Sequence, residues 1–145
     1  MSQQFEIPTP SAQVRAFAPL VGTWRVTGGA EGTVRYEWLE GGHFLIQHVN
    51  LVQDGVPAVG VEVIGHLRPF GQEPSEHVHS RFYDNQGNTL DYVHRMEGRE
   101  LTIWAGEAGS PIRFVGELSE DGRRLTGDWD YAGQGGYAST MTRID

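Results

Sequence analysis

The segment from Thr33 to Leu51 constrains the fold more than any other part of the sequence. It contains two runs rich in β-branched and aromatic residues, separated by Gly41-Gly42. Adjacent glycines readily adopt the positive φ angles that a tight hairpin turn requires. The segment therefore predicts two antiparallel strands joined by a turn.

The same pattern, a short strand followed by turn residues, continues to the end of the chain. No helical segment separates the runs, which favours antiparallel neighbours in one sheet. We interpret the chain as an all-β fold, a single up-and-down antiparallel β-barrel of about ten strands. The predicted strands cover residues 20–28, 33–40, 43–52, 59–68, 77–84, 89–96, 100–105, 112–118, 124–131 and 137–144.

A short helix is predicted ahead of the strands. Ser11 occupies the position of a helix N-cap, and Val14, Phe17 and Ala18 follow at helical spacing. Pro19 limits this helix to about two turns. Because so short a helix cannot form a core alone, we expect it to close one end of the barrel.

Composition limits the number of domains, the kinds of partner and the location that we expect. We expect residues 1–10 to form a flexible N-terminus and residues 11–145 to form one β-barrel domain, without a linker that would mark a second domain. The net charge of −8 argues against nucleic acid as a partner. The absence of cysteine excludes disulfides and thiolate chemistry. No apolar run is long enough to span a membrane and no secretory signal is recognisable, so we expect a cytoplasmic protein without a membrane partner.

Turn positions predict which side chains face each other across neighbouring strands. A loop centred on Asp121-Gly122 places Phe114 opposite Trp129, both directed inward. A loop centred on Gly41-Gly42 predicts the interior pairs Trp38–Leu45, Tyr36–Gln47 and Val34–Val49.

The hairpins around residues 77–105 are less constrained. A loop centred on Gln86-Gly87 predicts His79 opposite His94, and a turn at Gly98-Arg99 follows. The predicted interior face contains Leu90, Tyr92, His94, Met96, Leu101 and Ile103. The opposite face contains Phe82, Val93 and Trp104, which would form an apolar patch for a homodimer. A slip of one residue would exchange the two faces.

Several segments resemble those of a known superfamily. LVGTW at residues 20–24 resembles the Gly-x-Trp opening of calycins, which include lipocalins, fatty-acid-binding proteins and nitrobindins. The run YEWLEGGHFLIQHV, with FYDNQGN, LTIW and MTRI, resembles small uncharacterised bacterial lipocalin-like proteins of unknown function. The resemblance implies an up-and-down barrel with an interior ligand cavity, in which Trp24 packs across the closed end. Nitrobindins bind haem through a histidine near the C-terminus, but no histidine follows His94 here, and no cofactor is expected.

The leading interpretation is a binding protein for a small hydrophobic or amphipathic molecule. Aromatic side chains with a few polar groups are typical of the walls of ligand cavities. The candidate ligand-binding residues are Trp38, Gln47, Glu62, Tyr92, His94, Phe114 and Trp129.

A small metal-dependent or acid–base enzyme that uses His79, His94 and Glu62 is the alternative. His77 and His79 share one strand face, and the predicted register brings His94 close enough to bind a metal with them. Glu62 or His66 would complete the set of ligands. The competing interpretation is that these histidines are ordinary polar residues of a cavity or of the surface.

Glu62 and His66 also share a face and could transfer protons as an acid–base pair. Simple alternation favours the opposite orientation, with Val61 and Val63 inward and Glu62 in water. No catalytic residue and no metal ligand is assigned at this stage.

Overall fold

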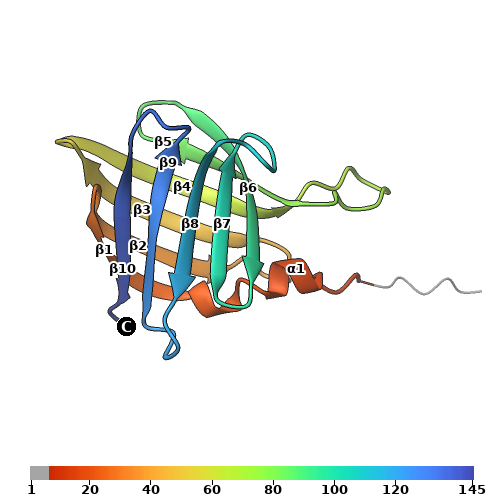
Figure 1. Cartoon of the computed structure of the whole chain (residues 1–145). Coiled ribbons are helices and arrows are strands. Elements are labelled where there is room, and N and C mark those ends of the chain that lie inside the picture. Colours follow the sequence, from red (N-terminus) through yellow and green to blue (C-terminus); the bar gives the residue numbers. More distant parts are fainter. Residues whose placement is uncertain (1–6) are drawn as a thin grey trace, which may run out of the picture.

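The computed structural model describes residues 7–145. Its strands form a closed barrel in which each strand is antiparallel to both neighbours, and β1 closes the barrel against β10 (Figure 1). The predicted up-and-down barrel is confirmed. The strands are β1 (Gly22–Gly28), β2 (Glu31–Trp38), β3 (Leu45–Gln53), β4 (Val56–His66), β5 (Val78–Asp84), β6 (Thr89–Glu97), β7 (Glu100–Ala105), β8 (Ile112–Leu118), β9 (Arg124–Tyr131) and β10 (Gly136–Arg143).

The predicted register is confirmed for three hairpins. Phe114 lies opposite Trp129, and Tyr36 lies opposite Gln47. The β8–β9 loop is longer than expected, because the backbone pair that closes it joins Ser119 and Arg124. The loop still contains an even number of residues, and an even number keeps the same side chains opposed. The pairs predicted around the β6–β7 turn are also present.

The predicted register of the β5–β6 hairpin is wrong by one residue. His79 lies opposite Val93, and His94 lies opposite Val78. The backbone N–H of Asp84 donates to the Asn88 carbonyl at 3.1 Å, which leaves the three residues 85–87 in the loop. Gly87 has a φ of 85°, as expected for the last residue of a three-residue hairpin loop. The odd loop length moves His79 to the outside of the barrel and Ser80 to the inside.

The N-terminal helix closes one end of the barrel (Figure 1). Helix α1 (Ala12–Arg15) is followed by the 3-10 turn η1 (Ala18–Leu20). Ser11 caps α1 by accepting the backbone N–H of Val14 at 3.1 Å. The side chains of Val14, Phe17 and Leu20 are almost fully buried in the core of the barrel.

Trp24 anchors this closed end, as the resemblance implied. Its side chain is fully buried, and its Nε1 donates to the Leu20 carbonyl at 2.9 Å. The Arg143 guanidinium lies 4.3 Å from the Trp24 ring centroid. It also donates to the carbonyls of Val21 and Pro19, each at 2.7 Å. The last strand is thereby fastened to the segment that enters the first strand.

The apolar patch predicted for a homodimer does not exist in the expected form. Phe82 faces the interior, because the β5 register is shifted. Val93 and Trp104 lie on the outer face, but they are only 1% and 9% exposed. The Arg95 guanidinium lies 5.0 Å from the Trp104 ring centroid. A homodimer stays a prediction without this patch as its basis.

Of the expected flexible segment 1–10, residues 1–6 lie outside the described residues. Within the described part, the Pro8 carbonyl contacts the imidazole Nε2 of His43 at 2.9 Å. Among residues 7–145, we find no helix with the length and apolar character needed to cross a membrane.

Candidate ligand-binding cavity

The barrel encloses a cavity of about 190 Å³ among the inward-facing side chains. Strands β2–β6 supply most of its polar groups, and β7–β10 with β1 supply a mainly apolar wall. The lining residues are Val26, Ala30, Val34, Tyr36, Gln47, Val49, Leu51, Glu62, Phe82, Tyr92, His94, Leu101, Ile103, Phe114, Leu125, Trp129, Tyr137, Ser139 and Met141.

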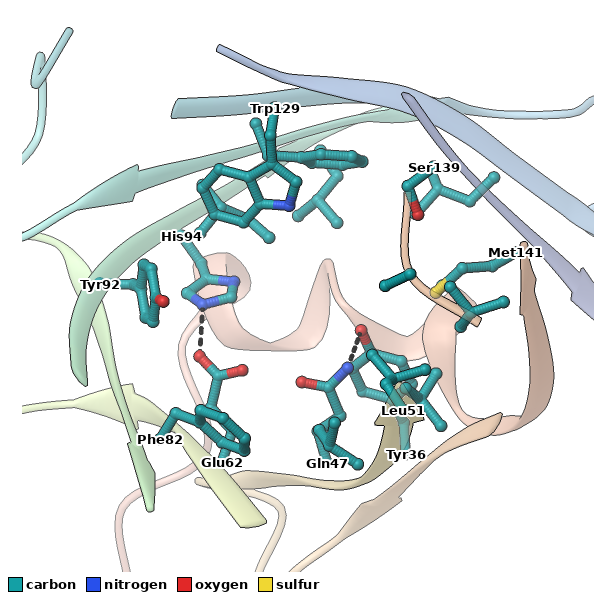
Figure 2. A pocket seen from close by; sticks show the side chains of 18 of the residues that line it. Tyr36, Gln47, Leu51, Glu62, Phe82, Tyr92, His94, Trp129, Ser139 and Met141 are labelled. Carbon is teal, nitrogen blue, oxygen red and sulfur yellow. Dashed lines mark hydrogen bonds and ion pairs between the residues drawn. The ribbon is translucent and has the colours of Figure 1, made fainter. Parts of the chain in front are cut away.

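Three neighbouring strands place one polar side chain each at the same level of the barrel. Tyr36 on β2 lies opposite Gln47 on β3, and Gln47 lies opposite Glu62 on β4. Opposed residues on one sheet face are close enough for their side chains to bond. The Gln47 Nε2 donates to the Tyr36 hydroxyl at 2.9 Å, as Figure 2 shows.

Glu62, Ser80 and His94 form a buried polar network beside these residues. The Ser80 hydroxyl donates to Glu62 Oε2 at 2.5 Å. The His94 Nε2 lies 2.9 Å from Ser80 Oγ and 3.2 Å from Glu62 Oε2. All three residues are less than 9% exposed. The Phe17 ring packs edge-on against the His94 ring, with 6.1 Å between centroids, so the segment between α1 and η1 covers the network from the closed end.

Which atoms of this network donate hydrogen bonds can be inferred from the carboxylate of Glu62. An ionised carboxylate can only accept hydrogen bonds, and the single Ser80 proton is directed to it. Ser80 Oγ must then accept from His94, so His94 Nε2 carries a hydrogen. In a serine-hydrolase triad the serine donates to the imidazole, and the carboxylate binds the other ring nitrogen. Here Ser80 and Glu62 contact the same nitrogen, which excludes that arrangement for a nucleophilic Ser80.

The opposite wall is aromatic. A row of cross-strand neighbours leads from His94 through Ile103 and Phe114 to Trp129 on β9. The Trp129 ring contacts those of Phe114 and Tyr92, with centroid separations of 5.7 Å and 6.0 Å. Figure 2 shows Trp129 across the cavity from Gln47 and Tyr36. An apolar body therefore fits between the aromatic wall and the polar groups.

Burial keeps the tyrosines of the cavity in their neutral form. Burial, with the negative charge of Glu62 as a second cause, raises the pKa of Tyr36 well above its usual value. Burial and the charges of Glu62 and Tyr131 raise the pKa of Tyr92 to about 12. Burial, followed by the effect of Tyr131, also raises the pKa of Tyr137. These hydroxyls therefore remain neutral donors and acceptors at physiological pH.

The cavity opens at the end of the barrel away from the helix. At the closed end, Phe17, Leu20 and Leu45 are almost fully buried. Towards the other end the inward-facing side chains are only half-buried: Leu51, Phe82, Tyr92, Trp129 and Tyr137. A ligand would therefore enter at this end of the barrel, which the β5–β6 and β9–β10 hairpins border (Figure 1).

The structure gathers six of the seven candidate ligand-binding residues around this one cavity: Gln47, Glu62, Tyr92, His94, Phe114 and Trp129. Trp38 does not line it. Although Trp38 faces inward, it lies where β2 ends, and it borders a separate crevice with Pro10 and Ala18. Ser80 was missed because the assumed β5–β6 loop was one residue too short. Tyr36 was recognisable as the partner of Gln47.

The candidate metal and acid–base residues are not brought together as expected. His79 lies on the outer face, so it does not join Glu62 and His94. Burial, followed by the charges of His77 and His66, lowers the pKa of His79. Within residues 7–145 no cluster of three or more histidine, aspartate and glutamate side chains is arranged to hold a metal ion.

Glu62 faces the cavity rather than water, so simple alternation predicted the wrong face of β4. Val61, which it would have placed inside, is 36% exposed, whereas Glu62 is 8% exposed. His66 shares the inward face with Glu62 but lies at the closed end. Its Nε2 is 2.8 Å from Ser11 Oγ, and its Nδ1 is 2.8 Å from the Ser75 carbonyl, so it joins the helix to the β4–β5 loop.

Together these features define a closed, up-and-down antiparallel β-barrel with one short helix and an interior cavity, an architecture that fits calycin-like barrels in general. Neither a scan against models of protein families nor a search of curated proteins finds a match for this chain.

Proposed function

We propose that this protein binds a small, mostly apolar molecule inside its barrel. The observation that carries the proposal is the cavity of about 190 Å³ that the inward side chains leave unfilled. Protein interiors normally close such spaces, because empty volume costs stability. An apolar wall with a few convergent polar groups is also the usual composition of a ligand site.

The volume limits the size of the ligand. An engineered cavity of about 150 Å³ in another protein accepts benzene. A cavity slightly larger than that suits a compact molecule with one or two rings. A long fatty acid or haem would need the barrel to expand.

We propose that the chain is a calycin, close to the small bacterial lipocalin-like proteins of unknown function. The order of the strands, the N-terminal helix and the buried Trp24 at the closed end support this membership. A cytoplasmic location stays a prediction.

Binding of toluene and naphthalene, followed through tryptophan fluorescence, tests the proposal. We expect both probes to bind the wild-type protein and to change its fluorescence, because the cavity is mainly apolar and Trp129 lines it. Val49→Phe fills part of the cavity and should abolish binding. Val61→Phe, on the outer face of the adjacent strand, is the matched control and should bind normally. Overpacking costs about 1–3 kcal/mol, which a folded domain of this size tolerates.

Native mass spectrometry of freshly purified protein is the complementary experiment. A mass that co-purifies with the wild-type chain but not with Val49→Phe would identify the physiological ligand. Equal probe binding by Val49→Phe and Val61→Phe would contradict the proposed location.

Acid–base chemistry on the bound molecule is a second candidate function, favoured by the buried contact between Glu62 and His94. Titratable groups buried beside a cavity are frequent acids and bases. Cyclohexanone fits the cavity and carries exchangeable hydrogens next to its carbonyl. We would measure their replacement by deuterium in D₂O. Exchange that is as fast with Glu62→Gln as with the wild type would contradict this candidate.

A further inference from the structure

Glu62, Gln47 and His94 each leave one polar side-chain atom without a hydrogen-bond partner among residues 7–145. Glu62 uses Oε2 for Ser80 and His94, which leaves Oε1, and Gln47 uses its amide nitrogen for Tyr36, which leaves its oxygen. His94 uses Nε2, which leaves Nδ1. In the described part of the chain every sealed side-chain nitrogen or oxygen is bonded, so these three atoms must face open space.

Figure 2 shows where these atoms point. The free carboxylate oxygen of Glu62 is turned towards the side of Gln47, and the second ring nitrogen of His94 is turned towards the middle of the cavity. Since Nε2 is used for Ser80 and Glu62, Nδ1 is the ring nitrogen that His94 leaves for a ligand. The polar wall therefore offers a carboxylate oxygen, an amide oxygen and an imidazole nitrogen to the same volume.

Among the described residues that line the cavity, none other than His94 can carry a positive charge to balance Glu62. No arginine is among the lining residues, and the chain contains no lysine. The hydroxyls of Tyr36 and Tyr92 are neutral and can donate or accept, so they do not set a preference for charge. An anionic ligand would meet the negative charge of Glu62 in a poorly hydrated space, where repulsion is weakly screened.

We infer that the ligand is an amphipathic amine, with a protonated nitrogen bonded to Glu62 and Gln47 and a ring system against Trp129. This inference rests on the proposed function, because it assigns a chemical class to the occupant of the same cavity. It also means that carboxylic acids of the same size are rejected.

Three probes that share one ring separate charge from shape. We would measure the binding of 2-phenylethylamine, 2-phenylethanol and phenylacetate by calorimetry at neutral pH. The amine should bind at least tenfold more tightly than the alcohol, and the carboxylate should bind more weakly than both. The alcohol has the size of the amine and can form neutral hydrogen bonds, so it reports on binding without the positive charge.

Glu62→Gln should reduce the preference for the amine over the alcohol to less than threefold, while the alcohol still binds. Glu117→Gln is the matched control, because it removes the same charge from an exposed side chain of the outer face and should leave the preference unchanged. Gln47→Met provides a second variant that keeps Glu62 in place. It should weaken binding of the amine more than that of the alcohol.

The outcomes separate this inference from the proposed function. If the alcohol binds and the amine binds no more tightly, the inference is wrong and the proposed function stands. A preference for the amine that persists in both Glu62→Gln and Gln47→Met would also overturn the inference. If none of the three probes binds but toluene does, the inference is wrong and the proposed function stands. If toluene also fails to bind, both fail.

Discussion

Replacing Phe17, which lies between α1 and η1, with alanine measures how much this N-terminal helical segment contributes to closing the barrel. Phe17 is 1% exposed and belongs to the core cluster. A buried phenylalanine removes about 150–250 Å² from water, which at about 25 cal/mol per Å² stabilises the fold by roughly 4–6 kcal/mol. Alanine retains part of that area, so we expect Phe17→Ala to lower the free energy of unfolding by about 3–5 kcal/mol.

The assay is urea-induced unfolding followed by tryptophan fluorescence, in which stability and the m-value are obtained together. Phe70→Ala is the control, because Phe70 lies in the β4–β5 loop and is fully exposed. We expect this control to change stability by less than about 0.5 kcal/mol. Because the Phe17 ring also covers His94, Phe17→Ala should admit water to the polar network.

The reasoning would be refuted if Phe17→Ala and Phe70→Ala lost the same small amount of stability. That result would mean that the barrel reaches its full stability without the helix at its end. A loss confined to the m-value, with an unchanged midpoint, would point instead to a change in the unfolded state.

Three further predictions concern the polar network, the closed end and the cavity tyrosines. Ser80→Ala should cost about 1–3 kcal/mol in urea unfolding, because it removes a donor from a buried carboxylate; Ser139→Ala, in the same cavity, should cost less than half of that. Arg143→Ala should lower the free energy of unfolding by about 2–4 kcal/mol, because it removes two charged hydrogen bonds and a cation–π contact. A similar loss in Arg113→Ala, on the exposed outer face, would contradict this. For Tyr92, whose pKa is raised to about 12, the folded state holds the proton more tightly than the unfolded chain. Its stabilising effect is therefore intact below about pH 10 and is lost as the pH rises towards 12, by up to roughly 1.4 kcal/mol per pH unit. In urea unfolding between pH 9 and 11.5, the free energy of unfolding should decline less steeply with pH for Tyr92→Phe than for the wild type. Identical slopes would disprove the effect.

The accuracy of the sequence-based register depended on the parity of each loop. The loops around Gly41-Gly42 and Asp121-Gly122 contain more residues than a minimal turn, but their even number kept Tyr36 opposite Gln47. The β5–β6 loop contains an odd number, and every side chain of β5 changed face as a result. Turn composition shows where a hairpin lies, but it does not fix how many residues the loop contains.

The candidate site residues also differ in how well the sequence predicted them. Aromatic residues on strands with confirmed register, such as Phe114 and Trp129, were placed correctly around the cavity. Glu62 faces inward although two valines flank it, because the pairing of β4 with β3 sets its face. Burial of this carboxylate is stabilised by hydrogen bonds from Ser80 and His94, which are distant in sequence.

The sequence alone determined the all-β class, the succession of antiparallel hairpins and the helix at the start, since these follow from local periodicity, turn residues and capping. The tertiary structure decided how the barrel closes, which face of β4 and β5 lines the cavity, and that Glu62, Ser80 and His94 meet. These features depend on pairing between strands and on the satisfaction of buried polar groups, which no local pattern encodes.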